Sequence, residues 1–355
     1  ADGTCTAKIT GRTGGGGLSN RNLIINGAMQ IAQRGTSSTA TGHGTVDRFA
    51  VYHSTDDAPT QSQSDVGLSD LPFTEQGITK CLKVTNGNQS GAGNAEYVEI
   101  NYKCEAQDIR NSGWNYQSSS SFITLSYYVR SSVAQTFTAW ITNRDGTRKN
   151  FVWSYALSAN TWTKITKVIP GDSGLTINND NGAAIELWFQ MFYGTNYSQA
   201  SPPGNNTGGW VNHDNQTVET NDTSWYLTND ATFEITGVQL EVGNHATSFE
   251  HRSVADELAR CQRYYEETYV MTDAGNSYVR VPVLYKVEKR AVGTPVSYAK
   301  RPDGVGTGAA NKAYQADGER TASCNYSWTG GTMLFVSGYS ANTDCFSNIR
   351  VNAEL

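Results

Sequence analysis

The chain of 355 residues is long enough for two domains, and only 17% of its residues are charged, below the roughly 25% of an average soluble domain. Its 35 Gly and 19 Tyr are typical of a sheet protein with many loops and argue against a helical bundle. The net charge of -6 argues against nucleic acid and anionic membranes as partners, because both require clustered Lys and Arg.

The first segment, residues 1–21, is expected to be a linker or an attachment segment. Its Gly-rich stretch GRTGGGG (11–17) lacks the Gly-Lys-Ser/Thr ending of a phosphate-binding loop. The segment also lacks the apolar centre of a secretory signal peptide, so we expect the chain to fold in a reducing cytoplasm. The longest apolar run, 183–193, is too short to span a bilayer, so no membrane insertion is expected.

Residues 22–250 show the alternating apolar pattern of β-strands. Every second residue is apolar in EYVEINYKC (96–104) and in SFITLSYYV (121–129), and TFTAWI and NFVWSYAL continue the pattern. GDSG, RDGT and NNDNG supply turns between these strands. The pattern predicts an all-β fold, with an antiparallel jelly-roll sandwich over 22–250.

The strand expected at 183–193 has two different faces. One face is apolar and is expected in the core; it consists of Ile185, Leu187, Phe189 and Met191. The other face mixes polar and aromatic side chains; it consists of Glu186, Trp188, Gln190 and Phe192. This second face is expected either to line a sugar-binding groove or to be covered by a loop or a neighbouring subunit.

The segment that follows, 194–226, is unusually long for a loop in a compact domain. Its aromatic and His residues are separated by small polar ones, as in adaptable recognition loops; they are Tyr197, Trp210, His213, Trp225 and Tyr226. We expect ligand contacts here, and the alternative is an insertion pinned by hydrophobic plugs. In the next strand the apolar phase changes at Gly237, which predicts a β-bulge.

A short helix is expected within 251–270, with Ser253 as its N-cap. Its apolar residues are spaced four, three and four apart; they are Val254, Leu258, Cys261 and Tyr265. Such a narrow seam suits packing of the helix against copies of itself, and packing onto the sandwich is the alternative.

The last segment, 271–355, is expected to form a small β-rich domain. Residues 278–287 alternate again, and Pro282 predicts an edge or bulged strand. The segment has few apolar positions for its length, so we expect oligomerisation to supply part of its buried surface.

No catalytic, metal or cofactor site is expected. GDSG at 171–174 lacks the context of a serine-protease nucleophile, and the His residues lack zinc-ligand spacing. The Glu residues do not by themselves establish the carboxylate pair of a glycosidase. The six Cys are expected to be free thiols, with a Cys324–Cys345 bridge across a hairpin as the alternative.

Three stretches resemble parts of bacteriophage tail fibres. NLIINGAMQIAQRGTS (22–37) with VDRFAVY (46–52) resembles the opening strands of a carbohydrate-binding-like module in these fibres. The stretch 235–268, with RCQRYY at 260–265, resembles the junction that closes the module. VRVPVLYKVEKRAVGTPV (279–296) resembles the strand that opens the distal tip domain, with Lys289 and Arg290 where the family tends to have Met and Arg.

The resemblance implies a trimeric receptor-binding fibre on the virion surface. The expected partners are two further chain copies, other virion proteins held by the N-terminal segment, and a host cell-surface polysaccharide. The candidate glycan-binding residues are Glu186, Trp188, Gln190, Tyr197, Trp210, His213 and Trp225. Two alternatives remain: a structural virion protein such as a head fibre or decoration protein, and a polysaccharide depolymerase.

Overall fold

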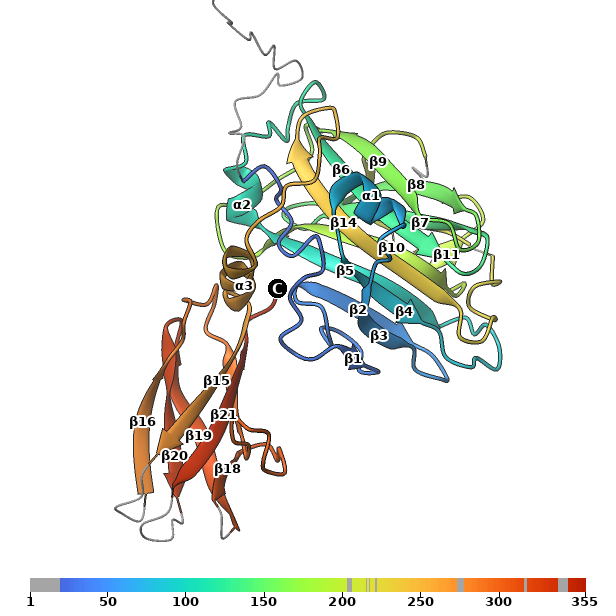
Figure 1. Cartoon of the computed structure of the whole chain (residues 1–355). Helices are drawn as coiled ribbons and strands as arrows, with labels where there is room; N and C mark the ends of the chain where they lie inside the picture. The colour runs from blue at the N-terminus through green and yellow to red at the C-terminus, as the bar shows by residue number, and fades with distance from the viewer. Residues whose placement is uncertain are drawn as a thin grey trace, which may run out of the picture. The chain divides into compact units, whose positions relative to one another are not determined.

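The computed structural model describes residues 20–202, 206–214, 216, 218–220, 222–272, 278–315, 318–337 and 344–355. The linker predicted at 1–21 therefore lies outside the described residues, apart from its last two positions. Contacts divide the chain into unit 1 (Ala1–Arg252) and unit 2 (Ser253–Leu355). Both units consist mainly of antiparallel strands, which confirms the all-β prediction (Figure 1).

Unit 1 is a sandwich of two six-stranded sheets. The first sheet has the order β1 (Ser37–Ser38), β3 (Thr60–Asp65), β4 (Lys80–Thr85), β14 (Thr232–Val242), β6 (Phe122–Ser131) and β9 (Thr163–Pro170). The second has the order β12 (Val211–Asn212), β8 (Lys149–Leu157), β7 (Gln135–Asn143), β10 (Ala183–Tyr193), β5 (Tyr97–Glu105) and β2 (Phe49–Ser54). The pair β11 (Ser198–Gln199) and β13 (Val218–Glu219) is parallel.

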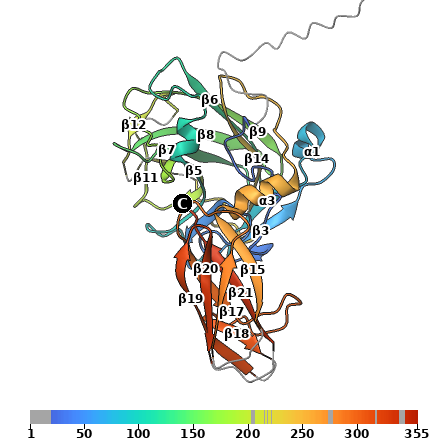
Figure 2. The same ribbon diagram turned by 90° about the vertical axis from the view of Figure 1, so that its left-hand side faces the viewer.

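The core of unit 1 lies between the two sheets. The apolar faces predicted for β5, β6 and β10 are all buried in one cluster, as the period of two requires. Helix α1 (Leu71–Gln76) packs on the outer face of the first sheet (Figure 2). Its Leu71 and Phe73 pack there against a cluster that contains Tyr128 and Trp162. Helix α2 (Ala106–Arg110) follows β5 directly and buries Ile109.

Two β-bulges change which side chains face the core. The bulge predicted at Gly237 is confirmed: the register of β14 shifts between Thr236 and Gln239, and Gly237 has a φ of 61°. A second shift, between Gln190 and Phe192 in β10, was not predicted. It turns Phe192 into the core, where its ring stacks on Tyr226, so the assignment of Phe192 to the outer face was wrong.

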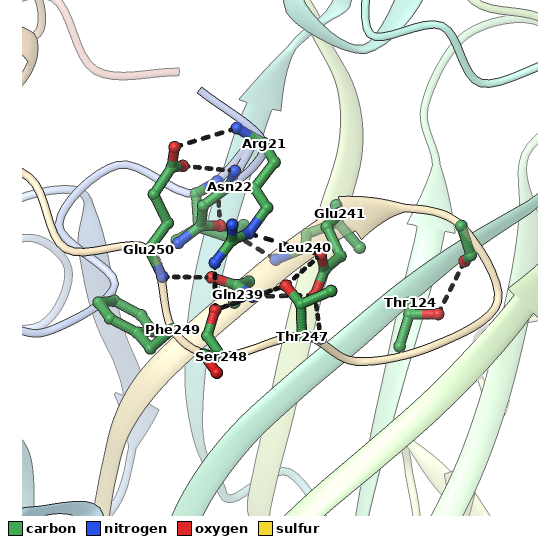
Figure 3. Close-up of polar contacts among 12 residues, drawn as sticks. Arg21, Asn22, Thr124, Gln239, Leu240, Glu241, Thr247, Ser248, Phe249 and Glu250 are labelled. Carbon is green, nitrogen blue, oxygen red and sulfur yellow. Dashed lines mark hydrogen bonds and ion pairs between the residues drawn. The ribbon is translucent and has the colours of Figure 1, made fainter. Parts of the chain in front are cut away.

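A polar network joins the first and last residues of the sandwich (Figure 3). The Glu250 carboxylate accepts hydrogen bonds from the backbone N–H groups of Arg21 and Asn22, at 3.3 and 2.8 Å. The Asn22 amide accepts from Leu240 N and donates to Val238 O. Glu241 accepts from Thr247 N at 2.8 Å. These bonds tie the stretch that opens the sandwich to the stretch that closes it.

Unit 2 begins with helix α3 (Val254–Gln262), capped by Ser253 Oγ, which accepts from Asp256 N at 3.1 Å as predicted. The helix is shorter than the segment 251–270 assigned to it. Tyr265 is the first residue of strand β15 (Tyr265–Thr272), which pairs antiparallel with β21 (Cys345–Asn352). The backbone of β15 therefore pairs with a neighbouring strand and does not continue the helix. Tyr265 is therefore not a helix residue, which corrects the predicted seam.

The sheet of unit 2 has the order β15, β21, β18 (Lys312–Gln315), β19 (Gly318–Trp328), β20 (Gly331–Ser337) and β16 (Tyr278–Leu284), with β17 (Thr294–Tyr298) also paired to β21. Strand β16, which contains Pro282, lies at the end of this order, as predicted for an edge strand. Neither Cys324 nor Cys345 forms a disulfide, and the same holds for the other Cys residues within the described part of the chain.

One ion pair in unit 2 is fully buried. Lys289 Nζ lies 2.7 Å from Glu266 Oε2, and neither side chain has any exposed surface. Both carboxylate oxygens of Glu266 accept from the backbone N–H of Lys286, and Lys289 Nζ also donates to Val287 O. The pair is thus compensated in both charge and hydrogen bonding, which a buried ion pair requires.

Candidate functional site

A pocket of about 450 Å³ lies on the outer face of the second sheet of unit 1. This volume is within the range of roughly 300–1,000 Å³ found for small-ligand sites. The lining comes from β7, β10, the β7–β8 turn and the segment after β10; it consists of Trp140, Thr142, Arg144, Arg148, Glu186, Trp188, Tyr193, Asn196, Tyr197, His213, Asp214 and Val218.

Adjacent strands place an aromatic pair in this pocket. Trp188 on β10 is directly opposite Trp140 on β7, so the two side chains emerge on the same face of the sheet. Their rings are stacked, with centroids 5.6 Å apart and planes 7° from parallel. Trp140 is buried, whereas Trp188 is half-buried and lines the pocket with part of its surface.

Glu186 lies two residues before Trp188 on the same face and is ion-paired on both oxygens. Its Oε2 lies 3.2 Å from Arg144 Nη1, and its Oε1 lies 3.6 Å from Lys103 Nζ. Lys103 is its cross-strand neighbour on β5, so the register of the sheet produces this contact. The buried carboxylate is therefore compensated by two cations, one of which faces the pocket.

His213 is held in one tautomer by its neighbours. Thr142 Oγ1 donates to Asn150 Oδ1 at 2.8 Å, which turns Asn150 Nδ2 toward His213 Nδ1 at 3.0 Å. Because an amide nitrogen only donates, Nδ1 must accept, and the ring proton is then on Nε2. Burial and the nearby Arg144 charge lower the pKa of His213, so at neutral pH the ring is an uncharged donor.

A cluster of three Tyr rings closes one side of the pocket. Tyr197 lies 5.6 Å from Tyr97 and 5.8 Å from Tyr193 between ring centroids. Because of the bulge in β10, the Tyr193 side chain lies on the outer face of the sheet, where it lines the pocket.

The Tyr193 hydroxyl donates to the buried Glu99 carboxylate. Burial raises the pKa of Glu99 to about 8, with a further rise from the Glu186 charge, while the Tyr193 hydrogen bond opposes the change.

The structure brings together four of the seven predicted glycan-binding residues: Glu186, Trp188, Tyr197 and His213. Gln190 is on the same face of β10 but is completely buried, and its amide has no hydrogen-bond partner within the described residues. Trp210 and Trp225 lie in the core of the sandwich, 9% and 0% exposed, and do not line the pocket.

Sequence reasoning missed Trp140, Arg144 and Arg148. The alternation of TFTAWI places Trp140 on the face opposite to the core residues Phe137 and Ala139, which was a usable signal. Its position beside Trp188 depends on the pairing of β7 with β10, which the sequence does not contain. Arg144 opens the predicted RDGT turn (144–147) and Arg148 directly follows it, and only the pairing of the strands brings this turn to the site.

No protein-family model and no curated protein matches this chain. Among solved structures, a tailspike protein 4 domain of bacteriophage CBA120 has a TM-score of 0.34 and 9% identity, with 62% of this chain and 21% of that chain covered. The N-terminal cellulose-binding domain of Cellulomonas fimi β-1,4-glucanase C scores 0.30 at 12% identity, over 61% and 99% of the two chains. A putative sugar-binding protein of Bacteroides thetaiotaomicron scores 0.31 at 11% identity, over 62% and 99%. Because these TM-scores lie below 0.5, the likenesses carry no conclusion about what this chain binds.

No group of three or more His, Cys, Asp or Glu side chains within the described residues is arranged to hold a metal ion. No helix in the same part of the chain has the length and apolar character needed to cross a bilayer.

Proposed function

We propose that unit 1 binds a saccharide in the pocket above β7 and β10, and that the chain is a virion fibre protein that attaches to a host cell-surface polysaccharide. The observation that supports this proposal is the combination of Trp188, half-buried on a stacked Trp140, with side-chain hydrogen-bonding groups around it. An aromatic platform with a few polar groups at its rim suits a sugar ring, which has apolar faces and hydroxyl groups at its edge.

The proposed action on the saccharide is binding without cleavage. A glycosidase requires one carboxyl group to give a proton to the leaving oxygen and a second to act on the other side of the bond. Glu186, the buried carboxylate of the pocket, is engaged by Arg144 and Lys103 on its two oxygens. Incubation of a bound polysaccharide with the protein should leave its chain length unchanged over hours, and shortening would instead favour a depolymerase.

We further propose that the chain forms a homotrimer through unit 2 and is joined to other virion proteins through its N-terminal segment. Eleven large apolar side chains are exposed in the described residues, and eight of them belong to unit 2. The core cluster of unit 2 contains few residues, the largest being Leu334 and Ile349. Association of copies would bury the exposed apolar surface and supplement this small core.

The test of saccharide binding compares the wild-type chain with Trp188→Ala and with Leu227→Ala on arrayed bacterial surface polysaccharides. Leu227 is 50% exposed in unit 1 and does not line the pocket, so it is a matched control. Trp188→Ala removes an aromatic anchor and should cost about 2 kcal/mol of binding free energy, which weakens binding roughly thirtyfold. Leu227→Ala should bind as the wild type does. If the wild-type chain binds none of the polysaccharides, the alternative of a structural virion protein is favoured.

A further inference from the structure

We infer that the saccharide taken by this pocket is acidic, and that its carboxylate binds the Arg148 guanidinium with Arg144 and His213 beside it. This inference rests on the proposed function, because it specifies the chemical class of the ligand at the same site. It depends on the hydrogen-bond donors of the pocket and on the cation Arg148, which is not needed to compensate the buried Glu186, in a chain whose net charge is -6.

Arg148 is the first of these groups. Its side chain lines the pocket and is half-buried, yet within the described residues its guanidinium has no acidic partner. The neighbouring cations are engaged: Arg144 binds Glu186, and Lys149 Nζ lies 2.6 Å from Asp172 Oδ1. The backbone carbonyl of Arg148 accepts a hydrogen bond from the backbone N–H of His213 at 2.9 Å. This bond holds the backbones of the two residues side by side.

The charge balance around the pocket points in the same direction. Two cations, Arg144 and Arg148, and two carboxylates, Glu186 and Asp214, line the pocket. Lys103 is not in the lining but adds a third cation beside Glu186. Glu186 is already compensated by two of these cations, and Asp214 is exposed to solvent, where its charge is screened. A guanidinium binds a carboxylate with two parallel N–H···O bonds, so Arg148 suits a uronate-type group better than a neutral hydroxyl group.

Two neutral donors add to the same preference. His213 carries its proton on Nε2, as the contact of Nδ1 with Asn150 requires. Trp188 Nε1–H is buried and has no acceptor within the described residues. A ligand rich in acceptor oxygens would satisfy these groups, and a carboxylate supplies two acceptor oxygens with a full negative charge.

The experiment measures affinity for uronate and sialate polysaccharides, namely polygalacturonate, alginate, hyaluronan and polysialic acid, each beside the same polymer with its carboxyl groups reduced to alcohols. Reduction keeps the sugar rings and linkages and removes only the charge. Three variants of the full chain are compared with wild type: Arg148→Gln, Trp188→Ala and Arg301→Gln. Arg301 is in unit 2 and pairs with Asp303, so its loss is a charge-matched control.

Wild type should bind at least one acidic polymer about ten- to hundredfold more tightly than its reduced form, and this preference should weaken as salt is raised. Arg148→Gln should remove the preference while keeping the residual affinity for the reduced form, Trp188→Ala should abolish both, and Arg301→Gln should change neither. If wild type binds the acidic polymer and its reduced form equally, and if Trp188→Ala but not Arg148→Gln abolishes this binding, the acidic preference is overturned. The saccharide site itself would then stand. Binding of no polymer by wild type would overturn both proposals.

Discussion

Trp210 and Trp188 have the same side chain in different environments. Trp210 is 9% exposed, its Nε1 donates to Pro170 O at 2.7 Å, and it belongs to the sandwich core. Trp210→Ala should therefore lower the free energy of unfolding by about 3–5 kcal/mol. Trp188→Ala should lower it by only about 1–2 kcal/mol, because Trp188 is half-buried and mainly loses its ring contact with Trp140. Urea unfolding of both variants measures the difference. A Trp210→Ala chain with unchanged stability but no saccharide binding would place Trp210 in the site instead.

Glu99 should make the stability of unit 1 depend on pH. Its pKa in the folded chain is about 8, above the ordinary 4.5, so the folded state binds the extra proton between these values. The stability should therefore fall as pH rises from about 4.5 to about 8, and should level off above that range. Glu99→Gln keeps an acceptor for the Tyr193 hydroxyl and cannot ionise. Denaturant unfolding at pH 5, 7 and 9 should show the variant gaining stability over wild type as pH rises, and parallel curves would contradict this assignment.

Lys289 is one half of the fully buried ion pair of unit 2. Its ammonium compensates the buried Glu266 carboxylate. Lys289→Met should leave that charge unpaired and cost about 3–5 kcal/mol. Addition of Glu266→Gln should recover part of the loss, because the amide oxygen still accepts from Lys286 N and carries no charge. A double-mutant cycle measured by chemical unfolding tests the coupling, and simple additivity would exclude it.

At the scale of the strand, alternation predicted the core faces of β5, β6 and β10 because one side of each strand is buried. The bulge at Gly237 was recognisable in the sequence, because the apolar residues before and after this glycine fall on opposite faces. The bulge between Gln190 and Phe192 was not recognisable, because Phe192 and Tyr193 are both aromatic and either fits the core pattern. The aromatic residues of the 194–226 segment have no period at all, so their burial was not readable from the sequence.

The bulge of β14 gives a test at the same scale. Gly237 has a φ of 61°, and an added Cβ would lie 2.9 Å from both Ile78 Cδ1 and Tyr128 Cδ2. Gly237→Ala should thus destabilise unit 1 by about 1–3 kcal/mol, through backbone strain and crowding together. Gly91→Ala, where no atom lies within 4 Å of the added Cβ, should change stability by less than about 0.5 kcal/mol. Equal melting temperatures for the two variants would show that the bulge is free to relax.

For the whole molecule, the pocket depends on which strands are neighbours. Glu186 and Trp188 were identifiable from one strand alone, because their face mixes aromatic and polar side chains. Trp140, Lys103 and Arg144 reach the site from β7, β5 and the β7–β8 turn, and the sheet order β8-β7-β10-β5 brings them there. Sequence periodicity assigns a face to each strand and contains no information on this order, so it identified Glu186 and Trp188 but not the residues that the neighbouring strands contribute.

The apolar surface of unit 2 provides the test of assembly. Met271 on β15 and Leu284 on β16 are 63% and 70% exposed, and both strands lie at ends of the sheet order. Side chains of this size are rarely left in water in groups, and edge strands readily accept a further partner. The wild-type chain should therefore have a solution mass of three times 38.6 kDa by light scattering.

The double variant Met271→Glu with Leu284→Glu should shift this mass toward that of a single chain, because association would bury two uncompensated charges per copy. It should keep the circular dichroism spectrum of the wild type, since both positions are exposed in one chain. Leu68→Glu with Leu227→Glu, at positions 71% and 50% exposed in unit 1, carries the same charge change and should remain trimeric. A wild-type chain with the mass of one copy would remove the trimer, and a trimer that persists in the double variant would place its interface outside these two edge strands.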